Sequence, residues 1–246
     1  MEKAKDMSAP PAIVSQPVGL LGEMELLLRN RFRFFAEIRD GVDVPRKIRA
    51  MFLYSSLFLA TFGAVIGSEH SVWQALASSV KLPLLFLITL LVCLPTLYFF
   101  NTIFQASLSL SQNLALLLSA VTMTAIVLLA FAPVTLFFLM TTSQYQFYKL
   151  LNVAIFAIAG WIGMRQLSQG MLMLTAHERR GARIRGRILQ VWILLYAFVG
   201  SQLAWTLRPF FGAPGLPFEL FRGLGGNFYT NIFASLGELF GFFTVR

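Results

Sequence analysis

The stretch KLPLLFLITLLVCLPTLYFFNTIF, residues 81–104, carries no charged residue after Lys81. A bilayer core of about 30 Å needs about 20 apolar residues in a helix, because backbone groups without hydrogen bonds in lipid each cost several kcal/mol. This stretch is therefore long and apolar enough to cross a membrane. Its internal proline, Pro95, removes one helical hydrogen bond, and we expect a bend there.

Four further stretches meet or approach the same requirement, namely residues 51–68, 114–140, 145–164 and 188–207. Pro133, near the end of residues 114–140, predicts a kink or an early stop. Trp192 and Trp205 lie near the two ends of the last stretch, where tryptophans commonly reach the lipid headgroups. We therefore predict an all-α fold, a polytopic membrane helix bundle of five transmembrane helices with flanking amphipathic helices.

The composition supports this fold class. Hydrophobic residues make up 57% of the chain and charged residues 13%, and the mean hydropathy is +0.71, far from the usual values of soluble domains. The net charge of +9 would suit nucleic acid only if the basic residues lined a soluble surface, but they flank apolar runs. We expect no nucleic-acid partner.

The basic residues are distributed unevenly between the loops. Of the 20 Lys and Arg, nine precede the first predicted span and six lie between the fourth and the fifth. With five spans and a cytoplasmic N-terminus these two groups share the inner side, which is a positive-inside pattern with the C-terminus outside. Residues 1–17 lack the apolar core of a cleavable signal peptide, which fits a bacterial inner (plasma) membrane.

The segment HERRGARIRGR, residues 177–187, contains a cluster of arginines. In a short loop at the membrane edge, such a cluster sets topology. Arginines close to an acidic leaflet also bind anionic lipid or phosphate, each contributing about 1 kcal/mol. Both interpretations stay open for the members of the cluster, which are Arg179, Arg180, Arg183, Arg185 and Arg187.

Amphipathic segments flank the predicted spans. Residues 20–38 place apolar side chains at helical spacings of three and four, in one stripe made of Leu21, Met24, Leu28, Phe32 and Phe35. This helix lies either in the inner interface or against the protein's own spans or another subunit. Residues 69–80 repeat the pattern weakly and predict a short interfacial helix.

Beyond the fifth predicted span, three prolines between residues 209 and 217 oppose a long helix. A final helix is predicted from about residue 228, with Asn227 or Thr230 as its cap and Phe240 on its apolar face. Phe32, Phe35 and Phe240 are our candidate partner contacts.

The chain therefore divides into four parts. They are a flexible cytoplasmic tail (residues 1–17), an amphipathic interfacial helix with its linker (18–50), a five-span membrane domain (51–207) and a non-cytoplasmic tail with an amphipathic helix (208–246).

The predicted spans contain no Asp, Glu or Arg, and Lys81 and Lys149 lie at span ends, which argues against proton-coupled transport. Asn101, Asn152 and Gln202 are polar candidates, either for hydrogen bonds between helices or for a solute path. Small residues four apart, Gly63 with Gly67, Ala159 with Gly163 and Gly200 with Ala204, predict close helix approach.

The sequence contains no recognisable catalytic or metal-binding motif. The chain has one cysteine and two widely separated histidines, and it carries no nucleophile elbow, zinc-protease or Walker-type motif. We therefore expect no catalytic residue, no metal and no cofactor.

Residues 81–104, with their Lys-x-Pro opening and internal Cys-x-Pro, resemble the Yip1-type membrane family, and the five-span layout with a cytoplasmic N-terminal tail is similar. The resemblance covers residues 45–207. It implies a helical integral membrane protein that acts through protein and membrane contacts rather than catalysis. The amphipathic N-terminal helix and residues 208–246 depart from the family pattern, and no individual functional residue is carried across.

We predict a non-enzymatic integral membrane protein that acts as an assembly, anchoring or scaffold subunit of a membrane complex. Its expected partners are lipids of the anionic leaflet and either another protein or further copies of itself. The alternative is an oligomeric channel or a passive transporter of small solutes or ions.

Overall fold

Eight α-helices, and no strand, make up the secondary structure of the residues that the computed structural model describes, which are 19–103, 108–142, 144–175, 182–212, 217–221, 223 and 226–239. The helices are α1 (Leu20–Arg29), α2 (Arg31–Arg39), α3 (Val44–Gly67), α4 (Val72–Ile103), α5 (Leu110–Thr141), α6 (Tyr145–Leu174), α7 (Ala182–Thr206) and α8 (Phe228–Leu239). Five of them, α3 to α7, are long and apolar enough to cross a membrane. The predicted all-α bundle with five membrane helices is confirmed.

The membrane helices are longer than the apolar runs that predicted them. α4 begins at Val72 and runs through Pro83 and Pro95, so the separate interfacial helix expected at residues 69–80 is wrong. α5 continues past Pro133 to Thr141, without the early stop. At 30 residues, α6 is about 45 Å long and exceeds the hydrocarbon core. The length of an apolar run gives the minimum length of the helix that crosses the lipid. The helix itself continues beyond the run until a capping residue or a helix-breaking residue stops it.

Close helix contacts hold α3, α4, α5 and α6 together. A Cβ on Gly67 would lie 2.6 Å from the backbone oxygen of Gln74, and one on Gly63 would overlap the backbone oxygen of Ser78. A Cβ on Gly163 would lie 2.9 Å from the backbone oxygen of Ala120. The close approach predicted for these glycines is therefore confirmed, between α3 and α4 and between α5 and α6.

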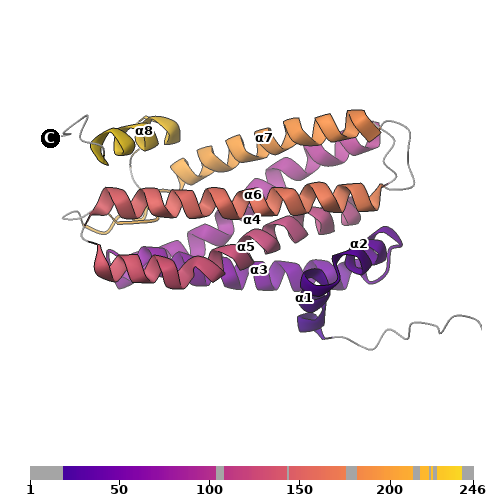
Figure 1. Ribbon diagram of the computed structural model, residues 1–246, viewed down its shortest axis with the longest axis horizontal. Helices are drawn as coiled ribbons and strands as arrows, with labels where there is room; N and C mark the ends of the chain where they lie inside the picture. Colours follow the sequence, from indigo (N-terminus) through magenta and orange to yellow (C-terminus); the bar gives the residue numbers. More distant parts are fainter. Residues whose placement is uncertain are drawn as a thin grey trace, which may run out of the picture.

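The helix α7 is arranged differently. α4 crosses the bundle obliquely, so its first turns pack on α3 and its last part packs on α7 (Figure 1). Trp192 of α7 is buried and donates a hydrogen bond from Nε1 to the backbone oxygen of Cys93 on α4, at 3.2 Å, rather than reaching the headgroups as expected. α7 makes few contacts with α6. The two helices therefore run side by side without packing tightly.

The bundle has two distinct ends. α1 and α2 lie at one end, together with the start of α3, the end of α6 and the start of α7 (Figure 1). We call this the α1–α2 end. α8 lies at the opposite end, beside the start of α6 and the end of α7, and we call this the α8 end. The described basic residues of α1, α2 and the first turns of α3, together with Arg187 near the start of α7, therefore belong to the α1–α2 end.

The amphipathic segment before α3 is two helices rather than one. The chain breaks at Asn30, whose side-chain oxygen accepts a hydrogen bond from the backbone nitrogen of Arg33 at 3.1 Å and caps α2. This break changes the helical register, so the stripe predicted for residues 20–38 is wrong. Of the predicted stripe only Met24 and Phe35 are buried, while Leu21, Leu28 and Phe32 are exposed. The other buried apolar side chains of this segment are Leu27, Phe34 and Ile38.

Candidate functional site

A large cavity lies between α6 and α7, and α4 and α5 form its floor. Its volume is about 1000 Å³. The residues after α7 and the first turns of α8 close it at the α8 end. We call it the α6–α7 cavity.

Small side chains on the two facing helices create this space. Ala157 and Gly160 line the cavity from α6, and Ala197 and Gly200 line it from α7. A Cβ on Gly160 would meet nothing within 4 Å, and one on Gly200 would make an ordinary 3.6 Å contact with Thr89. The close approach expected for Gly200 and Ala204 is therefore wrong: these residues border a cavity rather than a tight contact.

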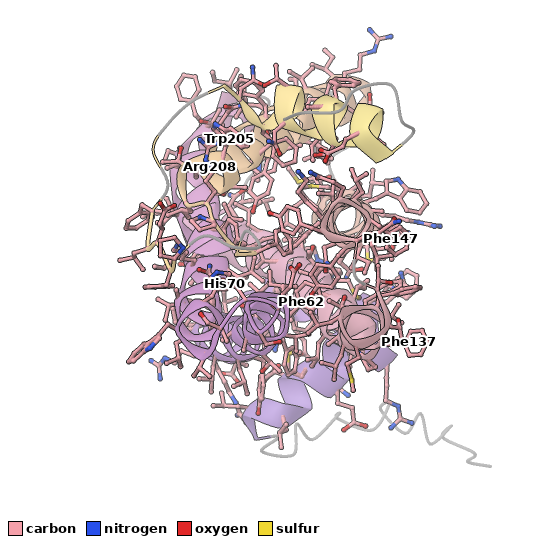
Figure 2. All side chains as sticks on the ribbon, turned by 90° about the vertical axis from the view of Figure 1, so that its left-hand side faces the viewer. Phe62, His70, Phe137, Phe147, Trp205 and Arg208 are labelled. Atoms are coloured by element: carbon pink, nitrogen blue, oxygen red, sulfur yellow. The ribbon has the colours of Figure 1, made fainter. Side chains whose placement is uncertain are left out.

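Polar groups of the cavity gather at the α8 end. Among its described lining residues the charged side chains are Lys149 and Arg208, both cationic. The Arg208 guanidinium stacks on Trp205, with 3.4 Å from Cζ to the ring centroid, and Nη2 donates to the backbone oxygen of Gly223 at 2.7 Å. Figure 2 shows Trp205 and Arg208 next to each other at this end. The stacking holds one cation in place.

The second cation ties α6 to α8. Nζ of Lys149 donates to Oδ1 of Asn231 at 3.2 Å, which uses one of its three N–H donors. One turn earlier, Nε2 of Gln146 donates to Oε2 of Glu238 at 2.7 Å. These bonds hold α8 across the cavity, and Asn227 caps α8 as predicted, since its Oδ1 accepts from the backbone nitrogen of Thr230 at 2.9 Å.

A buried lysine anchors the segment that follows α7. Lys81 is only 4% exposed, and its Nζ donates to the backbone oxygen of Pro209 at 3.2 Å and to that of Leu220. It also lies 4.9 Å from the ring centroid of Phe221. In the sequence Lys81 is only a cation at a span end, and its role as an anchor is not predictable there, because the carbonyl groups that it binds come 128 and 139 residues later.

Two polar side chains of α4 hold the same segment. Nε2 of Gln74 donates to the backbone oxygen of Pro209 at 2.8 Å, and Oγ of Ser78 donates to that of Phe210 at 2.7 Å. Glu69, in the loop before α4, is half-buried, and its Oε2 has no hydrogen-bond partner among the described residues. Burial raises the pKa of Glu69 to about 7.

A buried ion cluster occupies the α1–α2 end. Nζ of Lys47 on α3 lies 2.8 Å from Oε2 of Glu37 on α2 and 3.1 Å from Oε2 of Glu23 on α1. Arg33 also binds Glu37, at 2.8 Å from Nε to Oε1. Burial raises the pKa of Glu37, but hydrogen bonds from Lys47 and Arg33 outweigh it and lower the pKa below its usual value. We call Lys47, Glu23 and Glu37 the Lys47 cluster.

Glu23 and Glu37 lie away from the apolar stripe that the sequence predicts for residues 20–38, so the periodicity does not indicate that they form a buried cluster. The sequence does contain a signal for this cluster. Acidic residues within 20–38 are followed by basic residues at the start of α3, with which they can form ion pairs. Asn30, a strong cap residue within the apolar pattern, is the feature that would have predicted the break.

The predicted partner contacts have different outcomes. Phe32 is 69% exposed on α2, whereas Phe35 is fully buried, next to Gly170 of α6. The prediction for Phe35 is therefore wrong, because its side chain packs inside the chain itself. Phe240 lies outside the described residues.

The arginine cluster is only partly described. Arg179 and Arg180 lie outside the described residues, and for Arg183 and Arg185 the structure describes the backbone of α7 but not the side chain. Arg187 is exposed on α7. The lipid-binding interpretation of this cluster stays a prediction.

The three polar candidates of the spans are at separate places. Nδ2 of Asn101 donates to Oδ1 of Asn113 at 2.5 Å, between α4 and α5. Asn152 accepts from Thr135 at 3.3 Å and donates to the backbone oxygen of Tyr148 at 2.9 Å. Gln202 is half-buried on α7. None of these three candidates lines the α6–α7 cavity.

Within the described residues no three His, Cys, Asp or Glu side chains come together in a group able to hold a metal ion. In the comparisons with known proteins, no family model, no curated protein and no solved structure matches the chain. The resemblance to the Yip1-type family stays a prediction.

Proposed function

We propose that this chain, an integral membrane protein with five spanning helices, is a non-enzymatic assembly, anchoring or scaffold subunit of a membrane complex. The observation that carries the proposal is an exposed apolar surface on α1 and α2, which the ion pairs of the Lys47 cluster attach to α3 at the α1–α2 end. Leu21 is 71% exposed and Phe32 is 69% exposed, and Leu28 lies between them in the sequence, also exposed.

Polar contacts attach α1 and α2 to the bundle. Lys47 is 1% exposed and pairs with one carboxylate from each helix. Nη1 of Arg31 donates to Oε1 of Gln169 on α6 at 2.8 Å. A helix that only lies on lipid is oriented by the membrane through its apolar face and does not need ion pairs to the bundle. A surface for a specific protein partner gains from such ion pairs, since ordering it in advance reduces the entropy cost of binding. Apolar side chains in such a place mark an interaction surface.

The proposed orientation puts the α1–α2 end in the cytoplasm and the C-terminus outside, because the larger share of the basic residues belongs to the loops of that end. A bacterial inner membrane suits this arrangement. A reporter fused after Arg246 tests it: accessibility from the cytosol alone would contradict the orientation.

The experiment for the assembly role places a photocrosslinking amino acid at Leu21 or Phe32 of the full chain in native membranes. We expect protein adducts of discrete mass from both positions. Leu57, exposed on the spanning part of α3, is the matched control and should yield lipid adducts. If Leu21 and Phe32 give the same lipid adducts as Leu57 and the purified chain is a monomer, the proposal is refuted.

A channel is not proposed, because Asn101, Asn152 and Gln202 do not line a common path among the described residues. The resemblance of residues 81–104 to the Yip1-type family supports the assembly role, since it too implies action through protein and membrane contacts.

A further inference from the structure

We propose that the α6–α7 cavity binds an anionic amphiphile, with its acyl chain between α6 and α7 and its acidic headgroup at Lys149 and Arg208. The two chemical sources of such a ligand are an anionic phospholipid and a free fatty acid. This binding site is independent of the partner surface on α1 and α2.

The size of the cavity suits a small amphiphile with a long acyl chain. Its volume of about 1000 Å³ is at the upper end of ordinary small-molecule pockets.

The chemistry changes along the cavity in the way an amphiphile requires. Lys149 and Leu167 both line it from α6, and 18 residues of helix separate them by about 27 Å. From Val153 to Leu167 the lining of α6 consists of apolar side chains and glycines. A long acyl chain fits along this part, where it contacts side chains as apolar as itself.

The α8 end of the cavity is complementary to a negative charge. Lys149 and Arg208 come from α6 and from the segment after α7, and no acidic side chain is among the described lining residues. Glu238 is bound to Gln146 nearby and balances part of the positive charge. Carboxylate and phosphate oxygens accept strong hydrogen bonds from both lysine and arginine.

The ligand enters from the membrane. Trp161, in the spanning helix α6, lines the cavity and is also 67% exposed. The cavity therefore extends to the outer surface of the bundle at the depth of the membrane. α6 and α7 make few contacts with each other, so little packing between them opposes the passage of an acyl chain.

Native mass spectrometry of the full chain, purified in a delipidating detergent, tests the proposal. The probes are phosphatidylglycerol, oleate and phosphatidylcholine. We expect one equivalent of phosphatidylglycerol or oleate to bind saturably. Whichever of the two binds with the higher affinity identifies the natural ligand as a phospholipid or a fatty acid. Phosphatidylcholine should bind about tenfold more weakly, because its quaternary ammonium leaves the headgroup without net charge and is repelled by Lys149 and Arg208. No saturable binding, or equal binding of all three, overturns the proposal.

Two variants locate the binding. Gly160→Leu places an apolar side chain across the middle of the cavity, at a position where a Cβ meets nothing within 4 Å, and should abolish the bound equivalent. Gly186→Leu is the matched control, at an exposed glycine of α7 outside the cavity whose Cβ also meets nothing within 4 Å, and should keep it. Lys149→Gln should remove the preference for anionic probes.

Persistence of the equivalent in Gly160→Leu would show that the lipid binds elsewhere, for example at residues 179–187, and would overturn the proposal. So would a second polypeptide chain that occupies the cavity and excludes the probes. Thermal unfolding provides a check on folding: phosphatidylglycerol should raise the unfolding midpoint of the wild type and of Gly186→Leu, and leave that of Gly160→Leu unchanged.

Discussion

The ammonium group of Lys47 lies 2.8 Å from Oε2 of Glu37, and the lysine is almost completely buried. Together with Glu23 this contact joins α1, α2 and α3 at one end of the bundle. Burying a cation costs several kcal/mol unless close carboxylates compensate it, so the three side chains depend on one another. The position of the exposed apolar surface on α1 and α2 follows from this contact.

Lys47→Met should destabilise the protein by about 3–5 kcal/mol, because Glu23 and Glu37 would lose the buried cation that compensates them. Unfolding in detergent by heat or denaturant measures the change. The control is Arg29→Met, since Arg29 and Glu25 form an exposed pair on α1 that contributes about 0.5 kcal/mol. Equal effects of the two substitutions would show that the Lys47 cluster does not hold these helices.

Glu69 should make stability depend on pH. Its folded pKa of about 7 exceeds the ordinary value of 4.5, so the stability contributed by the protonated carboxyl is complete below pH 4.5 and is lost as the pH rises to 7. The loss is at most about 1.4 kcal/mol per pH unit. Glu69→Gln does not titrate and should be more stable than the wild type by about 2 kcal/mol above pH 7. A stability difference that stays constant across this range contradicts the prediction.

Gly163→Ala should separate α5 from α6, because the new Cβ would overlap Oγ1 of Thr124 and approach the backbone oxygen of Ala120. We expect a loss of about 1–3 kcal/mol in the free energy of unfolding. Gly160→Ala, on the same helix, meets nothing within 4 Å and should gain about 0.5–1 kcal/mol from helix propensity. Changes of the same sign in both variants would be inconsistent with the packing described.

Lys81→Met should release the segment after α7, because the backbone oxygens of Pro209 and Leu220 lose their donor. The loss should be about 1.5–3 kcal/mol, as for a hydrogen bond to a charged group. Hydrogen exchange of residues 217–221 and limited proteolysis are the measurements. Ser79→Ala is the control, since the Ser79 hydroxyl bonds Leu76 within α4. Unchanged exchange in Lys81→Met would mean that this lysine is not the anchor.

The number of spanning helices was predictable, whereas their ends were not. Residues 145–164 predicted α6, but the helix continues to Leu174 because no breaker interrupts it. Similarly, the periodicity of residues 20–38 predicted one helix, and Asn30 divides it into two with a different buried face. A local cap overrides a periodic pattern because it satisfies backbone donors that would otherwise be unpaired.

The candidate site was less predictable than the fold. Gly163 and Gly200 both belong to small-residue pairs of the same spacing, yet one permits a tight contact and the other borders a cavity. A small side chain allows either outcome, and the relative orientation of the neighbouring helices decides between them. Lys81 and Lys149 also looked alike in sequence, as cations at span ends, but only Lys81 is fully enclosed.

The sequence by itself determined the membrane class, the five apolar runs and the uneven distribution of basic residues, because these depend only on the order of residues along the chain and on the thickness of a bilayer. The tertiary structure alone decided that Lys47 meets two carboxylates and that α6 and α7 enclose a cavity with Lys149 and Arg208 at one end. These features depend on which helix faces meet, and packing between residues far apart in the chain sets those faces.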